Sequence, residues 1–114
     1  MSDPIAAFRA FDHDADSSVA VLTGAGSGIG RATATTLASV GVTVVCADID
    51  ENAAHLTAQW INENGGKASA VRTDVTSRAD IDALVDGAFA AHGRLDIMGN
   101  IAGVPHNKMV AEVT

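Results

Sequence analysis

Short apolar runs alternate with longer stretches of helical periodicity from residue 18 onward. Four runs rich in β-branched or small apolar residues predict strands at Val19–Thr23, Val42–Ala47, Ala68–Arg72 and Leu95–Asn100. Between them, apolar residues recur every three or four positions, which predicts helices. Strands that alternate with helices over short links indicate an α/β fold, a parallel sheet covered on both faces. Right-handed crossovers then give the expected strand order 3-2-1-4, one half of a doubly wound sheet plus the first strand of the second half.

The predicted helices have start and stop residues in the expected places. Asp50 and Ser77 are candidate N-cap residues, and Gly41 and Gly93 are candidate stops. In the helix after Asp50, one apolar face is formed by Ala53, Leu56 and Trp60. In the helix after Ser77, residues at helical spacing are Ile81, Leu84, Val85, Ala88, Phe89 and His92. We expect these faces to pack against the sheet.

Composition narrows the class of protein. A chain of 114 residues with 47% hydrophobic and 18% charged residues indicates at most one globular domain. We expect a flexible N-terminal arm at residues 1–17 and a partial domain at residues 18–114. A formal charge of −7 without a Lys/Arg cluster argues against a nucleic-acid partner. A single cysteine cannot form an internal disulfide and suits a reducing compartment, and the sequence shows no signal-peptide pattern, so we expect a cytoplasmic location. No apolar run is long enough for a membrane helix, so we expect no membrane partner.

A glycine-rich run, TGAGSGIG at residues 23–30, follows the first predicted strand and opens the first predicted helix. Glycines let the backbone approach a ligand closely, and a helix start offers free N–H groups and a positive dipole end. This context predicts a diphosphate site. The alternative is that the glycines serve only a tight turn.

Polar residues follow the next two predicted strands. Asp48 ends the second strand, where a carboxylate can accept both hydroxyls of an adenosine ribose and repel the 2′-phosphate of NADP. The alternative role is a charge at the start of the following helix, which Asp50 and Glu51 already supply. Asp74 and Val75 end the third strand, where a carboxylate and an amide could bind the edge of an adenine; the alternative is ordinary turn chemistry.

These signals together resemble the N-terminal half of the short-chain dehydrogenase/reductase family over roughly residues 18–105. TGAGSGIG matches the family's TGxxxGIG loop, Asp74-Val75 matches its adenine-binding pair, and NIAG at residues 100–103 matches its NNAG motif with one change. The resemblance implies a Rossmann-like fold and hydride transfer between NAD and an alcohol or carbonyl substrate. It also implies that NAD is bound by Gly24, Ser27, Gly28, Ile29, Gly30, Asp48, Asp74, Val75, Asn100, Ala102 and Gly103.

The chain departs from the family pattern in two positions and lacks the catalytic residues. Ile101 replaces the second asparagine of NNAG, and Gly99 replaces a branched apolar residue, which weakens a strand by roughly 0.5–1 kcal/mol. The family's catalytic residues are a serine and a Tyr-x-x-x-Lys motif, but this chain contains no tyrosine. We therefore assign no catalytic residue. The four histidines are scattered without metal-ligand spacing, so we assign no metal site either. The chain is interpreted as the cofactor-binding fragment of an oxidoreductase, inactive alone, so whether it is an enzyme stays open.

Two other functions fit some of these features. A non-catalytic or regulatory NAD-binding module would use the same cofactor residues. A methyltransferase-type fold also places an acidic residue after its second strand, although TGxxxGIG and NIAG together argue against it. In any of these cases the fourth strand lacks an outer neighbour, and a bare strand edge favours self-association.

Overall fold

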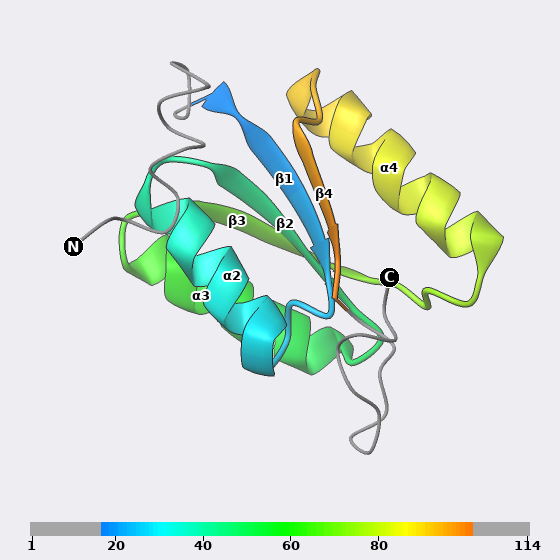
Figure 1. Cartoon of the computed structure of the whole chain (residues 1–114), viewed down its shortest axis with the longest axis horizontal. Coiled ribbons are helices and arrows are strands. Elements are labelled where there is room, and N and C mark those ends of the chain that lie inside the picture. Colours follow the sequence, from blue (N-terminus) through cyan, green and yellow to red (C-terminus); the bar gives the residue numbers. More distant parts are fainter. Residues whose placement is uncertain (1–16, 102–114) are drawn as a thin grey trace.

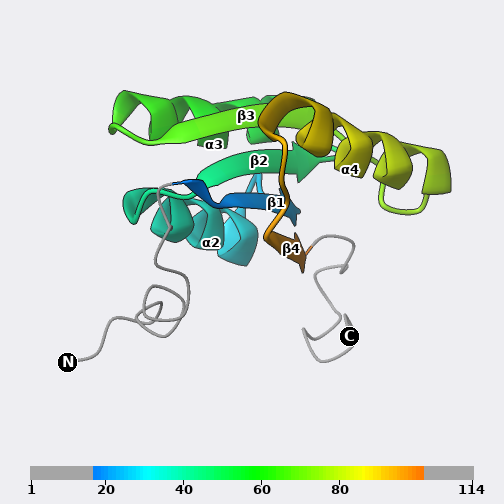
Figure 2. The same cartoon turned by 90° about the horizontal axis from the view of Figure 1, so that it is seen from above.

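The structure is a computed structural model that describes residues 17–101. All but one residue of the expected N-terminal arm, residues 1–17, therefore lie outside the described part. The elements are β1 (Val19–Thr23), α2 (Gly28–Ser39), β2 (Thr43–Asp48), α3 (Glu51–Glu63), β3 (Lys67–Arg72), α4 (Arg78–His92) and β4 (Ile97–Asn100). The strands form one parallel sheet in the order β3-β2-β1-β4, as Figure 2 shows. This confirms the predicted strand order.

Both faces of the sheet are covered by helices (Figure 1). One cluster of buried residues joins β1 and β2 to α2 and α3 and includes Leu22, Val44, Leu37 and Ile61. The other joins the opposite face of the same strands to α4 and includes Val21, Val45, Leu84 and Ala88. Because β1 is central, all five of its residues are buried, as expected for a parallel strand covered on both sides. The predicted doubly wound, Rossmann-like architecture is confirmed.

The predicted ends of the helices are confirmed. The Asp50 side chain accepts a hydrogen bond from the Ala53 N–H at 3.1 Å and caps α3. The Ser77 hydroxyl oxygen accepts one from the Asp80 N–H at 3.2 Å and caps α4. Gly93 ends α4 with φ of 75°, in the left-handed region that favours glycine.

The predicted inward face of α3 is wrong. Leu56 and Trp60 are 58% and 47% exposed, and the buried residues are instead Ala54, Thr57, Ala58 and Ile61. The exposed set and the buried set both recur at helical spacing, so periodicity does not distinguish them. The larger side chains of Leu56 and Trp60 made their face the more hydrophobic choice. Packing favours the smaller residues because they let α3 lie close to the sheet and to the glycine loop.

The predicted face of α4 is confirmed only at its centre. Leu84 and Ala88 are buried, whereas Phe89 is 50% exposed and His92 is exposed. Within residues 17–101, β1 pairs with β4 and no further strand pairs with the outer edge of β4. Self-association through this edge stays a prediction, which sedimentation velocity would check.

A hydrogen-bond network holds β4 to β1 at the edge of the sheet where the strands begin. Asp96 Oδ2 accepts from the Val19 N–H at 2.8 Å and from Arg94 Nε at 2.8 Å, and Asp96 Oδ1 accepts from a second Arg94 nitrogen at 2.6 Å. The Arg94 guanidinium, followed by the Val19 N–H, lowers the pKa of Asp96 below its usual value. The ionised carboxylate therefore stabilises the folded chain.

We expect Asp96→Ala to lower the free energy of unfolding by about 2 kcal/mol at neutral pH, because it leaves the Val19 N–H unpaired and removes charge-assisted bonds. A folded-state pKa below the unfolded value means that this contribution is present above about pH 4 and is lost as the pH falls through the folded pKa. Urea unfolding at several pH values measures both effects. An equal pH dependence in Asp96→Ala and the unmodified chain would contradict the assignment.

Candidate functional site

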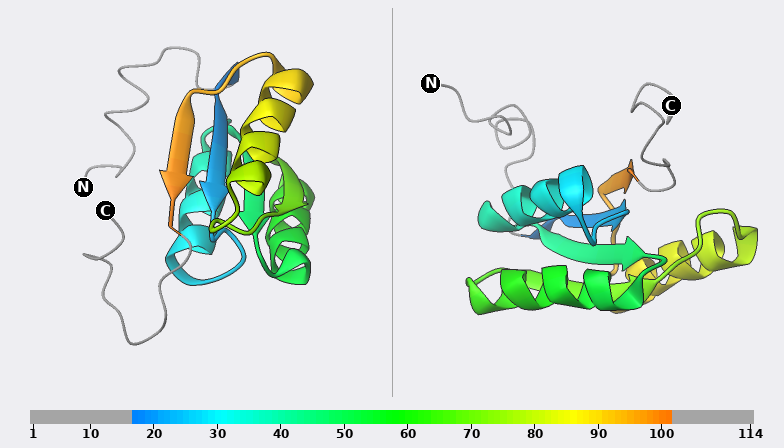
Figure 3. Two further views of the ribbon diagram at one scale, coloured as in Figure 1. Left: turned by 90° about the vertical axis from the view of Figure 1, so that its right-hand side faces the viewer. Right: turned by 90° about the horizontal axis from the view of Figure 1, so that it is seen from below.

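The glycine loop leaves β1 at the edge of the sheet where the strands end, as the parallel arrows of β1 and β4 show in the left panel of Figure 3. Gly24 and Gly28 have φ of 72° and 58°, which favours glycine. At Gly30 an added Cβ would lie 1.8 Å from the carbonyl oxygen of Gly24. These glycines are thus required by the fold of the loop itself, while Ser27, Gly28 and Ile29 are exposed at its tip.

The N-terminus of α2 is the one described helix start among α2, α3 and α4 without a side-chain cap. Ser27 occupies the N-cap position but its side chain accepts no capping hydrogen bond, and the first turn contains no acidic residue. In contrast, α3 and α4 each have a side-chain cap and an acidic residue in the first turn. The first N–H groups of α2 and its positive dipole end can therefore receive an anion beside the exposed loop.

Asp48 lies beside the loop at the end of β2, half-buried. Its Oδ2 atom accepts a hydrogen bond from the Gly26 N–H at 2.9 Å, and its Oδ1 atom accepts one from the Asp50 N–H at 3.0 Å. Since Asp50 caps α3 by itself, Asp48 is not needed as that cap. The carboxylate instead links the loop after β1 to the turn after β2.

The end of β3 is held against the same edge. The Thr73 N–H donates to the main-chain oxygen of Asp48 at 3.0 Å, which places Asp74 and Val75 next along the chain. The Asp74 Oδ1 atom accepts from the Thr76 hydroxyl at 2.6 Å and from the Thr76 N–H at 2.9 Å, and these bonds lower the pKa of Asp74. Asp74 therefore stabilises the turn through its Oδ1 atom. The ionised carboxylate can also accept a hydrogen bond from a ligand at its Oδ2 atom. The buried Thr73 hydroxyl has no hydrogen-bond partner among residues 17–101, which fits an edge that a ligand or water completes.

The end of β4 meets the start of the loop. The Thr23 hydroxyl donates to Asn100 Oδ1 at 2.8 Å, and the Ile101 N–H donates to the Thr23 main-chain oxygen at 3.3 Å. The main chain at Ile101 is therefore anchored although the family's second asparagine is absent. At Gly99 an added Cβ would lie 2.5 Å from Leu22 Cδ2, so the glycine makes room for a buried leucine. Ala102 and Gly103 lie outside the described residues.

The structure brings the described predicted residues to one edge of the sheet. Gly26 contacts Asp48, the β3 end contacts Asp48, and Asn100 contacts Thr23, which precedes Gly24. Thr57 is a residue of this region that the sequence argument missed: it is fully buried, and its hydroxyl donates to the Ala25 carbonyl at 2.9 Å. Thr57 lies at helical spacing from Ala54, Ala58 and Ile61, and this spacing could have indicated that it is buried. The larger apolar residues on the other face of α3 favoured that face instead.

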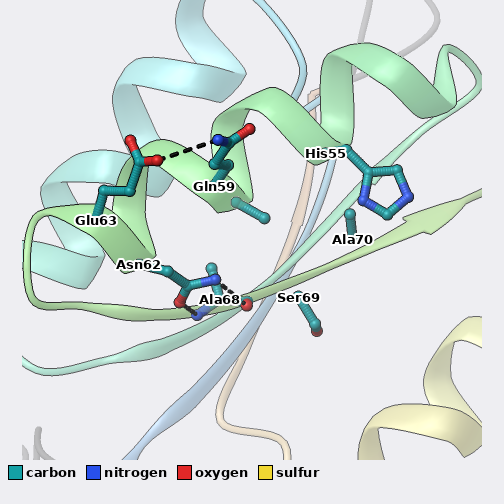
Figure 4. A pocket seen from close by; sticks show the side chains of 8 residues that line it. His55, Gln59, Asn62, Glu63, Ala68, Ser69 and Ala70 are labelled. Carbon is teal, nitrogen blue, oxygen red and sulfur yellow. Dashed lines mark hydrogen bonds between the residues drawn. The ribbon is translucent and has the colours of Figure 1, made fainter.

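Other polar features in the described part do not compete with this edge. An open groove of about 660 Å³ between α3 and β3 is lined by none of the predicted cofactor residues (Figure 4). There Gln59 bonds Glu63, and the Asn62 carboxamide bonds both the N–H and the carbonyl of Ala68. Residues 17–101 contain no group of three His, Cys, Asp or Glu residues that could hold a metal ion. Cys46 is buried, which raises its pKa to about 11 and disfavours the reactive thiolate.

No helix within residues 17–101 combines the length and apolar character that crossing a membrane requires.

Comparisons with known proteins agree with this geometry. The profile of the family described as short chain dehydrogenase matches residues 18–114. The chain is 43% identical over 88 residues to 7alpha-hydroxysteroid dehydrogenase of Escherichia coli (77% of this chain, 34% of the relative). It is 46% identical over 90 residues to cis-4-hydroxycyclohexanecarboxylate dehydrogenase of Sinomonas cyclohexanicum (79% and 36%).

A solved structure supports the same comparison. The short chain dehydrogenase/reductase from Burkholderia phymatum in complex with NAD superposes with a TM-score of 0.74 at 46% identity, covering 76% of this chain and 31% of that one. The chain spans about a third of the length of the curated relatives it matches. The methyltransferase-type alternative finds no support in these matches.

Proposed function

The chain belongs to the short-chain dehydrogenase/reductase family, and from this premise we propose that it supplies the NAD-binding part of an oxidoreductase. The reaction proposed for the whole protein is hydride transfer between NAD and an alcohol or carbonyl substrate. The observation that carries the proposal is the contact between Asp48 and the glycine loop, 2.9 Å from Asp48 Oδ2 to the Gly26 nitrogen. This contact holds the Asp48 carboxylate, for which we propose the ribose-binding role, beside an uncapped helix start.

Each part of the dinucleotide has a proposed place at this edge. The diphosphate binds at the N-terminus of α2, over the loop tip formed by Ser27, Gly28 and Ile29. The Asp48 carboxylate holds the hydroxyls of the adenosine ribose. Asp74 and Val75 hold the adenine, and Asn100 lines the nicotinamide side. The family resemblance assigns the same role to Ala102 and Gly103, which lie outside the described residues. The hydrogen bond that Asn100 Oδ1 accepts from the Thr23 hydroxyl, at the start of the loop, supports this proposal.

We propose that the site prefers NAD to NADP. Asp48 is acidic, and a 2′-phosphate on the ribose would place two negative charges side by side. The neighbouring Ser27 and Ile49 carry no positive charge that would offset this repulsion. The Burkholderia phymatum relative was solved in complex with NAD, which supports a dinucleotide cofactor, and the preference itself rests on Asp48.

We propose that these 114 residues by themselves bind the cofactor without turning over substrate. Bound NAD supplies the hydride acceptor, and the chain's own residues hold and orient it. Hydride transfer to or from an alcohol or carbonyl also requires a group that moves a proton at the substrate oxygen. In the family this group is a tyrosine, and none of the 114 residues is a tyrosine.

Calorimetric titration of the chain with NAD and with NADP, followed by an assay for NADH with a panel of alcohols, tests the proposal. We expect saturable NAD binding, NADP binding weaker by about tenfold or more, and no NADH. Absence of NAD binding would overturn the cofactor assignment. NADH production by the chain alone would show that another residue moves the proton.

A further inference from the structure

The peptide group between Ala25 and Gly26 is held from both sides by residues far away in the sequence. The Thr57 hydroxyl donates to the Ala25 carbonyl oxygen at 2.9 Å. Asp48 Oδ2 accepts from the N–H of Gly26, the other end of the same peptide group, also at 2.9 Å. Because a trans peptide is planar and its C=O and N–H point in opposite directions, the two contacts fix the orientation of the whole group.

The surroundings of this peptide group leave it no solvent to replace a lost bond. Ala25 and Thr57 are both 0% exposed, and Gly26 is buried. The Ala25 N–H is also engaged, because it donates to the Ala47 carbonyl at 3.0 Å. Without the Thr57 hydroxyl, the buried Ala25 carbonyl would lose this hydrogen-bond donor. A rotation of the peptide that brings the carbonyl to another donor would then lower its free energy.

The orientation of this peptide matters for an anion at the loop. Two residues later the chain enters α2, whose first residues, Gly28 and Ile29, are exposed at the loop tip and whose N-terminus has no side-chain cap. A rotated peptide would turn a carbonyl oxygen toward the Asp48 carboxylate and withdraw the Gly26 N–H from it. The loop would then lose its link to β2, and the N–H groups that follow would shift away from the position that receives a phosphate.

We propose that Thr57 is a positioning residue for the diphosphate site, acting through the Ala25–Gly26 peptide rather than by touching the ligand. The inference rests on the proposed function, since it needs a dinucleotide at this loop. It assigns to α3, which provides none of the predicted cofactor-binding residues, the task of fixing the loop that binds the phosphates. A rotated peptide would still leave Asp48 its second hydrogen bond, from the Asp50 N–H at 3.0 Å. The ribose and adenine part of the site should therefore depend on Thr57 less than the phosphate part does.

The test compares ADP-ribose, which contains the diphosphate, with adenosine, which lacks phosphates. Thr57→Val removes the hydroxyl and keeps the shape of the side chain. We expect it to weaken ADP-ribose binding by about three- to tenfold and adenosine binding by less than about twofold. Thr57→Ser, which keeps the hydroxyl, should restore ADP-ribose binding. Thr36→Val is the matched control, because the only partner of the Thr36 hydroxyl among residues 17–101 is the Ala32 carbonyl within α2.

Calorimetry measures ADP-ribose and NMR titration measures the weaker adenosine binding, with each variant first shown to be folded by its thermal transition. Should Thr57→Val not fold, Thr57→Ser and Thr57→Ala give the same comparison of hydroxyl against no hydroxyl. Unchanged ADP-ribose binding, or equal losses for both ligands, would overturn the inference and leave the proposed function intact. Failure of the unmodified chain to bind ADP-ribose would overturn both.

Discussion

Replacing Gly30 with alanine is expected to disrupt the glycine loop and to abolish measurable dinucleotide binding. The added Cβ would lie 1.8 Å from the Gly24 carbonyl oxygen and 2.6 Å from the Gly24 carbonyl carbon. Both are backbone atoms, so the clash cannot be relieved by rotating a side chain. We expect a loss of about 3 kcal/mol or more in the free energy of unfolding, at the upper end of overpacking effects. Urea unfolding and NAD calorimetry measure the two consequences.

Gly87→Ala is the matched control for this substitution. Gly87 lies inside α4, and an added Cβ there would meet nothing within 4 Å. In a helix interior, alanine is more favourable than glycine by about 1 kcal/mol. The free energy of unfolding of this variant should therefore equal or exceed that of the unmodified chain. NAD binding should be unchanged. A Gly30→Ala chain with normal stability and normal NAD affinity would show that α2 and the Gly24 turn do not pack as described.

Replacing Asp48 with alanine is expected to produce the largest loss of affinity that leaves the fold intact. The substitution removes the proposed acceptor for the ribose hydroxyls. It also removes the partner of the Gly26 N–H. Two charge-assisted hydrogen bonds amount to about 2–4 kcal/mol, or roughly 30- to 1000-fold in the dissociation constant for NAD. The preference for NAD over NADP should disappear at the same time, since the repelling charge is gone. Calorimetric titration with both dinucleotides measures these changes.

Asp82→Ala controls for the change in net charge. Asp82 is on α4, its side chain is 65% exposed, and it pairs only with Arg78 at 3.7 Å within the described residues. Such a pair contributes at most about 1 kcal/mol to stability, and its loss should leave both dinucleotide affinities unchanged. If Asp48→Ala bound NAD as tightly as Asp82→Ala, the ribose assignment would be wrong.

The sequence was sufficient for the fold because several local features agree. The same alternation of strands and helices is predicted by apolar strands and by residues typical of helix ends. The structure confirms the helix starts at Asp50 and Ser77, the helix end at Gly93, and the fully buried strand β1. Parallel strands joined by right-handed crossovers leave few arrangements, so the strand order followed. Each of these features involves residues that are close together in the sequence, so one sequence is enough to detect them.

The parts that the sequence did not predict depend on residues distant in the chain. The inward face of α3 is set by how closely it approaches the loop and α2, so Leu56 and Trp60 were misplaced and Thr57 was missed. Gly99 was expected only to weaken β4, but it also makes room for Leu22 of β1. The sequence alone places the motif residues in the loop after the first strand and at the ends of the other strands. It gives no sign of the hydrogen bonds that orient the Ala25–Gly26 peptide.

The most direct test of a dinucleotide site at the ends of β1 and β2 is an NMR titration of the isotopically labelled chain with NAD. We predict that backbone amide shifts change at residues 24–30, 48–50 and 74–75, and that the amides lining the groove between α3 and β3 stay unchanged. Shifts confined to that groove, or no shifts at millimolar NAD, would contradict the account.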